Sequence, residues 1–171
     1  FIVDLDSSEL SQVIDGPEST RNLLINGDTL YALDPITETV WVFDLSALAA
    51  PSETPESVED SSILLTTIRV GNNPNGMAID TANNRLYVGN TLDNTVSVID
   101  TLTNQEIIRI SVDEDDIGAG FDRDGDQPFA IATGTFGGTS YVFVASFNAN
   151  SVVVIHGQNL NVVDVFPNNE L

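Results

Sequence analysis

Three aspartates in an acidic stretch of the second half of the chain are the residues best suited to bind a metal ion. Asp122, Asp124 and Asp126 occupy alternate positions around Gly125. This spacing lets a tight loop wrap a hard cation, and Ca²⁺ takes about six to eight oxygen ligands from such loops. An EF-hand would place a glutamate at residue 133, which is a threonine here. The stretch therefore predicts either a calcium site or a solvated acidic loop.

The composition excludes several other kinds of chemistry. The chain has 171 residues, with a single histidine and no cysteine. Zinc sites of the common kind need cysteine or several histidines, and a thiol nucleophile or a disulfide framework needs cysteine. A catalytic histidine needs a partner, and the sequence contains no Gly-x-Ser-x-Gly nucleophile motif. We therefore predict no catalytic residues in this chain.

The charge balance limits the kinds of partner that the protein can bind and the compartments in which it is expected. The chain has 26 Asp and Glu, five Arg and no Lys, which gives a net charge of -21. Affinity for nucleic acid comes largely from clustered Lys and Arg, so no nucleic-acid partner is expected. No apolar run reaches the ~20 residues of a membrane span. A strongly like-charged surface favours solubility in salt. We expect an extracytoplasmic protein (secreted, cell-surface or periplasmic), with the cytoplasm of a halophile as the alternative.

The elements that position these residues come from an internal repeat. Residues 31–44, 87–100 and 143–156 align without a gap at an offset of 56 residues. A partial fourth copy opens the chain, where Ile2-Val3-Asp4 matches Val98-Ile99-Asp100. Such self-similarity indicates an architecture built from one repeated supersecondary unit.

Each copy predicts four short antiparallel strands. Two β-rich runs flank a turn at Pro35–Glu38, Leu92–Asn94 and Asn148–Asn150. One further strand precedes each pair, at Asn22–Asn26, Gly76–Asp80 and Phe129–Thr133. Another follows it, at Leu64–Val70, Glu106–Val112 and Asn161–Phe166. Four such strands form the blade of a β-propeller.

The middle copy resembles the YVTN-type β-propeller repeat over residues 74–110. That pattern has Pro-x-Gly before the first strand, Tyr-Val-x-Asn in the second and Val-x-Val-Ile-Asp in the third. Pro74–Gly76, Tyr87–Asn90 and Val96–Asp100 match it, and the flanking copies keep it loosely. The resemblance implies membership of the surface-layer and lactonase-like propeller superfamily, which includes periplasmic binding proteins and enzymes.

The strand count predicts an incomplete ring. Residues 1–17 supply the last two strands of one blade, and whole blades follow at 18–71, 72–112 and 128–171, whereas propellers close with about four to eight blades. Insertions are expected at 47–62, an exposed loop, and at 113–127, the acidic loop. We therefore expect an all-β fold of about three and a half blades from a seven-bladed ring. The chain opens in mid-strand, which indicates a processed or truncated product.

Arg21, Asn75 and Phe129 are the candidate ligand-binding residues. They begin the innermost strands of the three blades, near the axial channel in which propeller ligands bind, and plain channel lining is the alternative. His156 occupies the repeat position of Asp100 at the end of a third strand, where a polar side chain can bond the backbone of the turn. We expect His156 to cap its turn and not to act as a general base.

The leading functional prediction is a non-enzymatic extracytoplasmic scaffold that presents loops for protein or ligand binding in a cell-envelope or secreted assembly. One alternative is a lactonase-like or other hydrolase whose catalytic residues lie in blades absent from this chain. Another is a propeller docked to a redox protein. In each case the expected partner is the remainder of the propeller, on the same chain or another.

Overall fold

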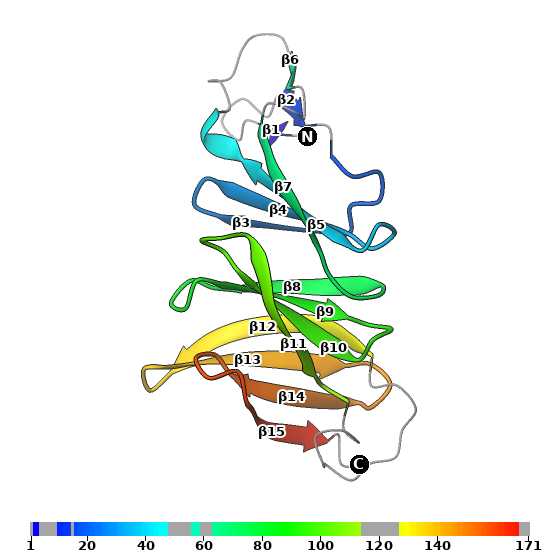
Figure 1. Cartoon of the computed structure of the whole chain (residues 1–171), viewed down its shortest axis with the longest axis vertical. Helices are drawn as coiled ribbons and strands as arrows, with labels where there is room; N and C mark the ends of the chain where they lie inside the picture. Colours follow the sequence, from blue (N-terminus) through cyan, green and yellow to red (C-terminus); the bar gives the residue numbers. More distant parts are fainter. Residues whose placement is uncertain are drawn as a thin grey trace.

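The computed structural model describes residues 2–3, 10–14, 16–47, 56–58, 63–113 and 127–167. Their strands form four sheets that follow one another along the molecule in chain order (Figure 1). Three of these sheets are four-stranded and antiparallel, so the predicted all-β fold of propeller blades is confirmed. No helix in the described part of the chain is long and apolar enough to cross a membrane.

The three complete sheets are called blades 1, 2 and 3. Blade 1 consists of β3 (Asn22–Asn26), β4 (Thr29–Asp34), β5 (Thr39–Asp44) and β7 (Leu64–Arg69). Blade 2 consists of β8 (Pro74–Asp80), β9 (Arg85–Asn90), β10 (Thr95–Asp100) and β11 (Gln105–Ser111). Blade 3 consists of β12 (Pro128–Phe136), β13 (Thr139–Ser146), β14 (Ser151–His156) and β15 (Val162–Pro167).

Strands pair in chain order within each blade, so the first strand lies at one edge and the fourth at the other. The first strand of blade 2, β8, lies beside both β3 and β12. The three first strands therefore line the inner side of the arc, toward the axis of the propeller. This arrangement brings the starts of consecutive blades together, although they are far apart in sequence.

Apolar residues occupy both faces of the middle strands of blade 2, because this blade is covered on both sides. Leu86 and Val88 on β9 belong to one buried apolar cluster with Tyr31 of blade 1. Tyr87, between them, belongs to a second buried cluster with Val142 of blade 3. In blade 3 the strand β13 alternates between buried and half-buried positions, because the described structure covers only one of its faces.

The insertion at 47–62 is not a plain exposed loop, and this expectation is corrected. Glu56–Val58 forms β6, which pairs in parallel with β2 (Leu10–Ile14). Together with β1 (Ile2–Val3) these strands make the first sheet, in the order β1-β2-β6. A free strand edge offers unpaired N–H and C=O groups, and the insertion supplies a strand to that edge. The insertion follows a short 3-10 helix, η1 (Leu45–Ala47).

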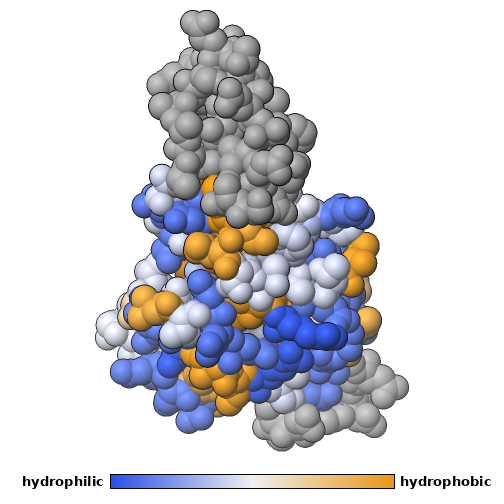
Figure 2. All heavy atoms as spheres, turned by 45° about the horizontal axis from the view of Figure 1, so that its top comes forward, coloured by the Kyte–Doolittle hydropathy of each residue, from blue (hydrophilic) through white to orange (hydrophobic). Residues whose placement is uncertain are grey.

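In each of the three blades, a β-bulge interrupts the fourth strand at the same repeat position. The pairing register shifts between Val42 and Phe43 and at the two equivalent places, which leaves Leu65, Ile107 and Val163 unpaired in the ladders. These three side chains are about half exposed, and apolar patches reach the surface among polar residues in Figure 2. Because a bulge twists a strand edge and disrupts its pairing, the outer edges are poor templates for edge-to-edge aggregation.

Candidate functional site

The starts of the inner strands enclose the candidate site. Arg21 lies directly before β3, Asn75 lies near the start of β8, and Phe129 lies near the start of β12. The structure brings all three to one cavity of about 300 Å³, here called the axial cavity. Its remaining lining residues are Asn22, Gly76, Met77, Ala130 and Ile131. Residues more than 50 positions apart in sequence thus share one cavity because β8 lies between β3 and β12.

A chain of hydrogen bonds crosses the three blades beside this cavity. Arg21 Nη1 donates to Asn75 Oδ1, and Asn75 Nδ2 donates to Thr91 Oγ1 at 2.7 Å. The Thr91 hydroxyl donates in turn to the Pro128 carbonyl at 2.8 Å. Asn75 and Thr91 are both buried. These hydrogen bonds therefore hold the Asn75 amide with its oxygen toward Arg21, and they orient the Arg21 guanidinium.

Arg21 differs from the other described arginines in its partners. Arg69 pairs with Glu38, and Arg109 pairs with Glu106. Arg85 donates to the carbonyls of Gly157 and Gln158. Within the described ranges, Arg21 forms no ion pair, and its side chain makes only the hydrogen bond to Asn75. It therefore keeps most of its donors for a group that enters the cavity.

Several residues that line the axial cavity are apolar. The Phe129 side chain is 55% exposed, and its ring lies 6.3 Å from that of Phe147, tilted by 46°. Met77 is buried and Ile131 is half-buried. The cavity therefore combines one cationic end with an aromatic and aliphatic wall, a combination that is typical of small-molecule sites.

Sequence reasoning found three residues of the cavity and missed the rest. Thr91 follows the Tyr-Val-x-Asn motif, and its contact with Pro128 depends on how blades 2 and 3 pack. Met77 and Ile131 look like ordinary strand residues in an apolar run. No periodicity within one strand could have indicated that they face a cavity between blades.

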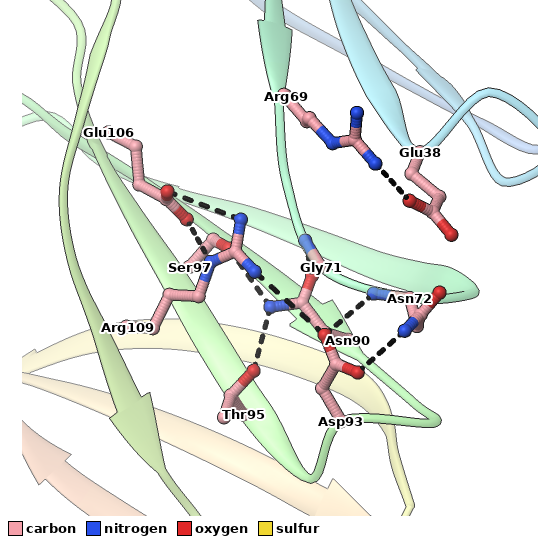
Figure 3. Close-up of polar contacts among 10 residues, drawn as sticks. All are labelled: Glu38, Arg69, Gly71, Asn72, Asn90, Asp93, Thr95, Ser97, Glu106 and Arg109. Carbon is pink, nitrogen blue, oxygen red and sulfur yellow. Dashed lines mark hydrogen bonds and ion pairs between the residues drawn. The ribbon is translucent and has the colours of Figure 1, made fainter.

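The asparagine of the Tyr-Val-x-Asn motif has a structural role at the junction of blades 1 and 2 (Figure 3). Asn90 Oδ1 accepts the backbone N–H of Gly71 at 2.9 Å. Its Nδ2 donates to Thr95 Oγ1 at 3.0 Å and to Ser97 Oγ at 2.9 Å. One buried side chain thus ties the link after blade 1 to two strands of blade 2.

A second polar cluster joins blades 2 and 3 at the other ends of the inner strands. The buried Asp80 accepts a hydrogen bond from the Ser140 hydroxyl. Ser140 lines a separate cavity of about 280 Å³ together with His156. His156 Nδ1 accepts the backbone N–H groups of Gln158 and Asn159 at 3.2 and 3.4 Å, which confirms the predicted turn cap. Ser140 and His156 are thus engaged in separate structural hydrogen bonds and not in a nucleophile–base pair.

The hydrogen bonds at Asp80 make the stability of this junction depend on pH. Burial opposes ionisation of Asp80, but hydrogen bonds from Ser140, Asn83 and the backbone of Ala82 outweigh it and lower its pKa. Because the folded pKa lies below the unfolded value of about 3.9, the stabilisation is present above that value. It is lost as the pH falls through the folded pKa.

As the pH is lowered from about 5 to about 2, the urea midpoint of Asp80→Asn should decrease less than that of the wild type. Ser140→Ala should also make that decrease smaller, because without the Ser140 hydrogen bond the folded pKa of Asp80 rises toward the unfolded value. Urea unfolding followed by circular dichroism at several pH values measures both effects. An Asp80→Asn profile parallel to that of the wild type would contradict this role.

Asp122, Asp124 and Asp126 lie outside the described residues, so the calcium site stays a prediction. Among the residues that are described, no three His, Cys, Asp or Glu side chains form a group that could hold a metal ion.

The outer face of blade 3 carries apolar residues at positions that are covered in the other blades. Ile68 of blade 1 and Ile110 of blade 2 are 6% and 9% exposed, whereas Phe166, at the same place in blade 3, is 55% exposed. Phe143 is half-buried, whereas the equivalent Tyr87 is fully buried beneath blade 3. This face has the composition of a blade-to-blade interface.

Comparison with solved structures also indicates that these blades belong to a larger β-propeller. Hydrazine synthase from Kuenenia stuttgartiensis matches with a TM-score of 0.65 at 22% identity, over 92% of this chain and 38% of that chain. The WD40 repeats of RRP9 match with a TM-score of 0.65 at 12% identity, over 91% and 41%. The β-propeller domain of Myceliophteria thermophila Cps50 (Swd1) matches with a TM-score of 0.59 at 12% identity, over 88% of this chain and 40% of that chain. No protein-family model and no curated protein matches the sequence.

The chain has a β-propeller fold and spans about 40% of the length of these structures. Together with the open face of blade 3, this coverage means that the described blades are part of a propeller. Other blades or partners must complete it.

Proposed function

We propose that this chain belongs to a non-enzymatic β-propeller scaffold outside the cytoplasm, which binds a ligand or a protein partner at the inner ends of its blades. The axial cavity carries this proposal, because three successive blades each supply a residue to it. Arg21 keeps free donors there, and Phe129 offers an exposed ring. The net charge of -21 supports the location outside the cytoplasm. The YVTN-type repeat supports membership of the surface-layer and lactonase-like propeller superfamily.

The hydrogen bonding of the second cluster favours binding over hydrolysis. Ser140 donates to Asp80, and His156 Nδ1 is occupied by its own turn. A serine nucleophile needs a base within hydrogen-bond reach, and among the described residues no hydrogen bond joins Ser140 to His156. The partner that completes the propeller is, in this proposal, a further blade of the same repeat that packs on Phe143 and Phe166.

Nuclear magnetic resonance of the ¹⁵N-labelled chain tests the binding role. Benzyl alcohol, a neutral ring-bearing probe, should shift the amide signals of Gly76 and Ala130 in a saturable way at millimolar concentration. The amide of Gly138, at the cavity of the second cluster, serves as the internal control. γ-Butyrolactone added to the same sample should decay no faster than in buffer. Faster decay would overturn the proposed function, and so would the absence of a response at the axial cavity both to benzyl alcohol and to charged probes that carry the same ring.

A further inference from the structure

We propose that the axial cavity selects a monoanionic carboxylate that carries an apolar body about the size of one aromatic ring. This inference rests on the proposed function, which gives the cavity its binding role. It adds the chemical class of the ligand, which follows from the charge, the hydrogen bonding and the size of the cavity.

The guanidinium of Arg21 is prepared to bind an acid group. It has five N–H donors in a planar fork, and within the described structure one of its nitrogens is bonded, to Asn75 Oδ1. Asn75 is held in turn by Thr91, so the orientation of the arginine does not have to be created when the ligand binds. A planar carboxylate can accept two parallel N–H bonds from such a fork.

The charge of the surroundings limits the ligand to a single negative charge. Among the described residues that line the cavity, Arg21 is the one that carries a charge. The whole chain carries a net charge of -21, but at physiological salt interactions between exposed charges are largely screened beyond about 8 Å, so the charges beside the cavity matter most. A dianion would bring a second charge that no cation among the described lining residues could meet. The structure therefore favours a carboxylate over a phosphate monoester.

The apolar lining residues determine the apolar part of the ligand. Phe129 presents a ring that is 55% exposed, and Met77, Ala130 and Ile131 extend this apolar surface. The volume of about 300 Å³ lies at the lower end of the range for small-molecule sites, roughly 300–1,000 Å³. One ring fits such a space, and stacking on Phe129 would remove apolar surface of both rings from water.

Titration of the ¹⁵N-labelled chain with benzoate tests this class directly. Benzoate should shift the amide signals of Asn75, Gly76 and Phe129 and the Nε–H signal of Arg21 in a saturable way. Its affinity should be at least tenfold higher than that of benzyl alcohol, which lacks the charge. It should also exceed the affinity of phenylphosphonate, which carries the same ring and a second charge at pH above 8.

Three variants separate the arginine fork from a general effect of charge. Arg21→Gln should weaken benzoate binding at least tenfold and leave benzyl alcohol unchanged. Arg21→Lys should recover only part of the affinity, because an ammonium cannot form two parallel bonds in the plane of the carboxylate. Arg69→Gln is the matched control, since it removes one positive charge from an arginine whose side chain is 80% exposed. It should bind benzoate as the wild type does.

The possible results distinguish the ligand class from the binding role. Equal affinity for benzoate and benzyl alcohol would overturn the carboxylate class and leave the scaffold function in place. Tighter binding of phenylphosphonate, or undiminished benzoate binding by Arg21→Gln, would also overturn the class. No response to any of the three probes would overturn the class and the binding role together.

Discussion

Replacing Asn90 by alanine should lower the free energy of unfolding by about 3 kcal/mol, because its buried amide makes three hydrogen bonds. The side chain is fully buried, and its loss leaves the Gly71 N–H and the hydroxyls of Thr95 and Ser97 without their partner. A buried donor left unpaired costs about 1–3 kcal/mol. Thermal unfolding followed by circular dichroism should show a melting temperature lower by roughly 6–12 °C.

The same position in blade 3 provides the control for this prediction. Ser146 is also buried, at 4% exposure, but its hydroxyl has no hydrogen-bond partner among the described residues. Ser146→Ala should therefore be neutral or slightly stabilising, because it removes an unsatisfied polar group. If both alanine variants lowered the melting temperature equally, cavity formation and not the hydrogen bonds of Asn90 would explain the loss.

Replacing Gly76 by alanine should cost about 2 kcal/mol, because the inner strands leave no room for a methyl group there. A Cβ at this position would lie 2.8 Å from the Phe129 carbonyl oxygen and 3.1 Å from Ala130 Cα. Both atoms belong to the backbone of β12, so relief requires β8 and β12 to move apart. Urea unfolding of the variant and the wild type measures the difference.

Gly89→Ala is the matched control on the neighbouring strand β9. Its added Cβ would meet Ile131 Cδ1 and the Pro128 carbonyl oxygen at 3.4 Å, close to ordinary contact. Alanine also restricts the unfolded chain more than glycine does, so Gly89→Ala should be close to neutral. Equal losses for the two variants would show that a general intolerance of side chains, and not the close approach of β8 and β12, limits this region.

The sequence by itself determined the repeat and the strands within it. Strand β3 was predicted with its observed bounds, Asn22–Asn26, and the turn cap at His156 followed from its equivalence with Asp100. These features depend on local alternation of residues and on short-range hydrogen bonds. Both are visible in a stretch of a few residues, and the offset of 56 residues repeats them.

Tertiary structure decided the features that depend on contact between blades. Asn90 and Ser146 occupy the same repeat position, yet only the packed structure shows that one is fully hydrogen-bonded and the other is not. Likewise, the pairing of β6 with β2 and the place of Thr91 beside the axial cavity depend on backbone segments far apart in sequence. The physical reason is that the burial and bonding of a side chain depend on which blade lies beside it, and the pattern within one strand does not contain that information.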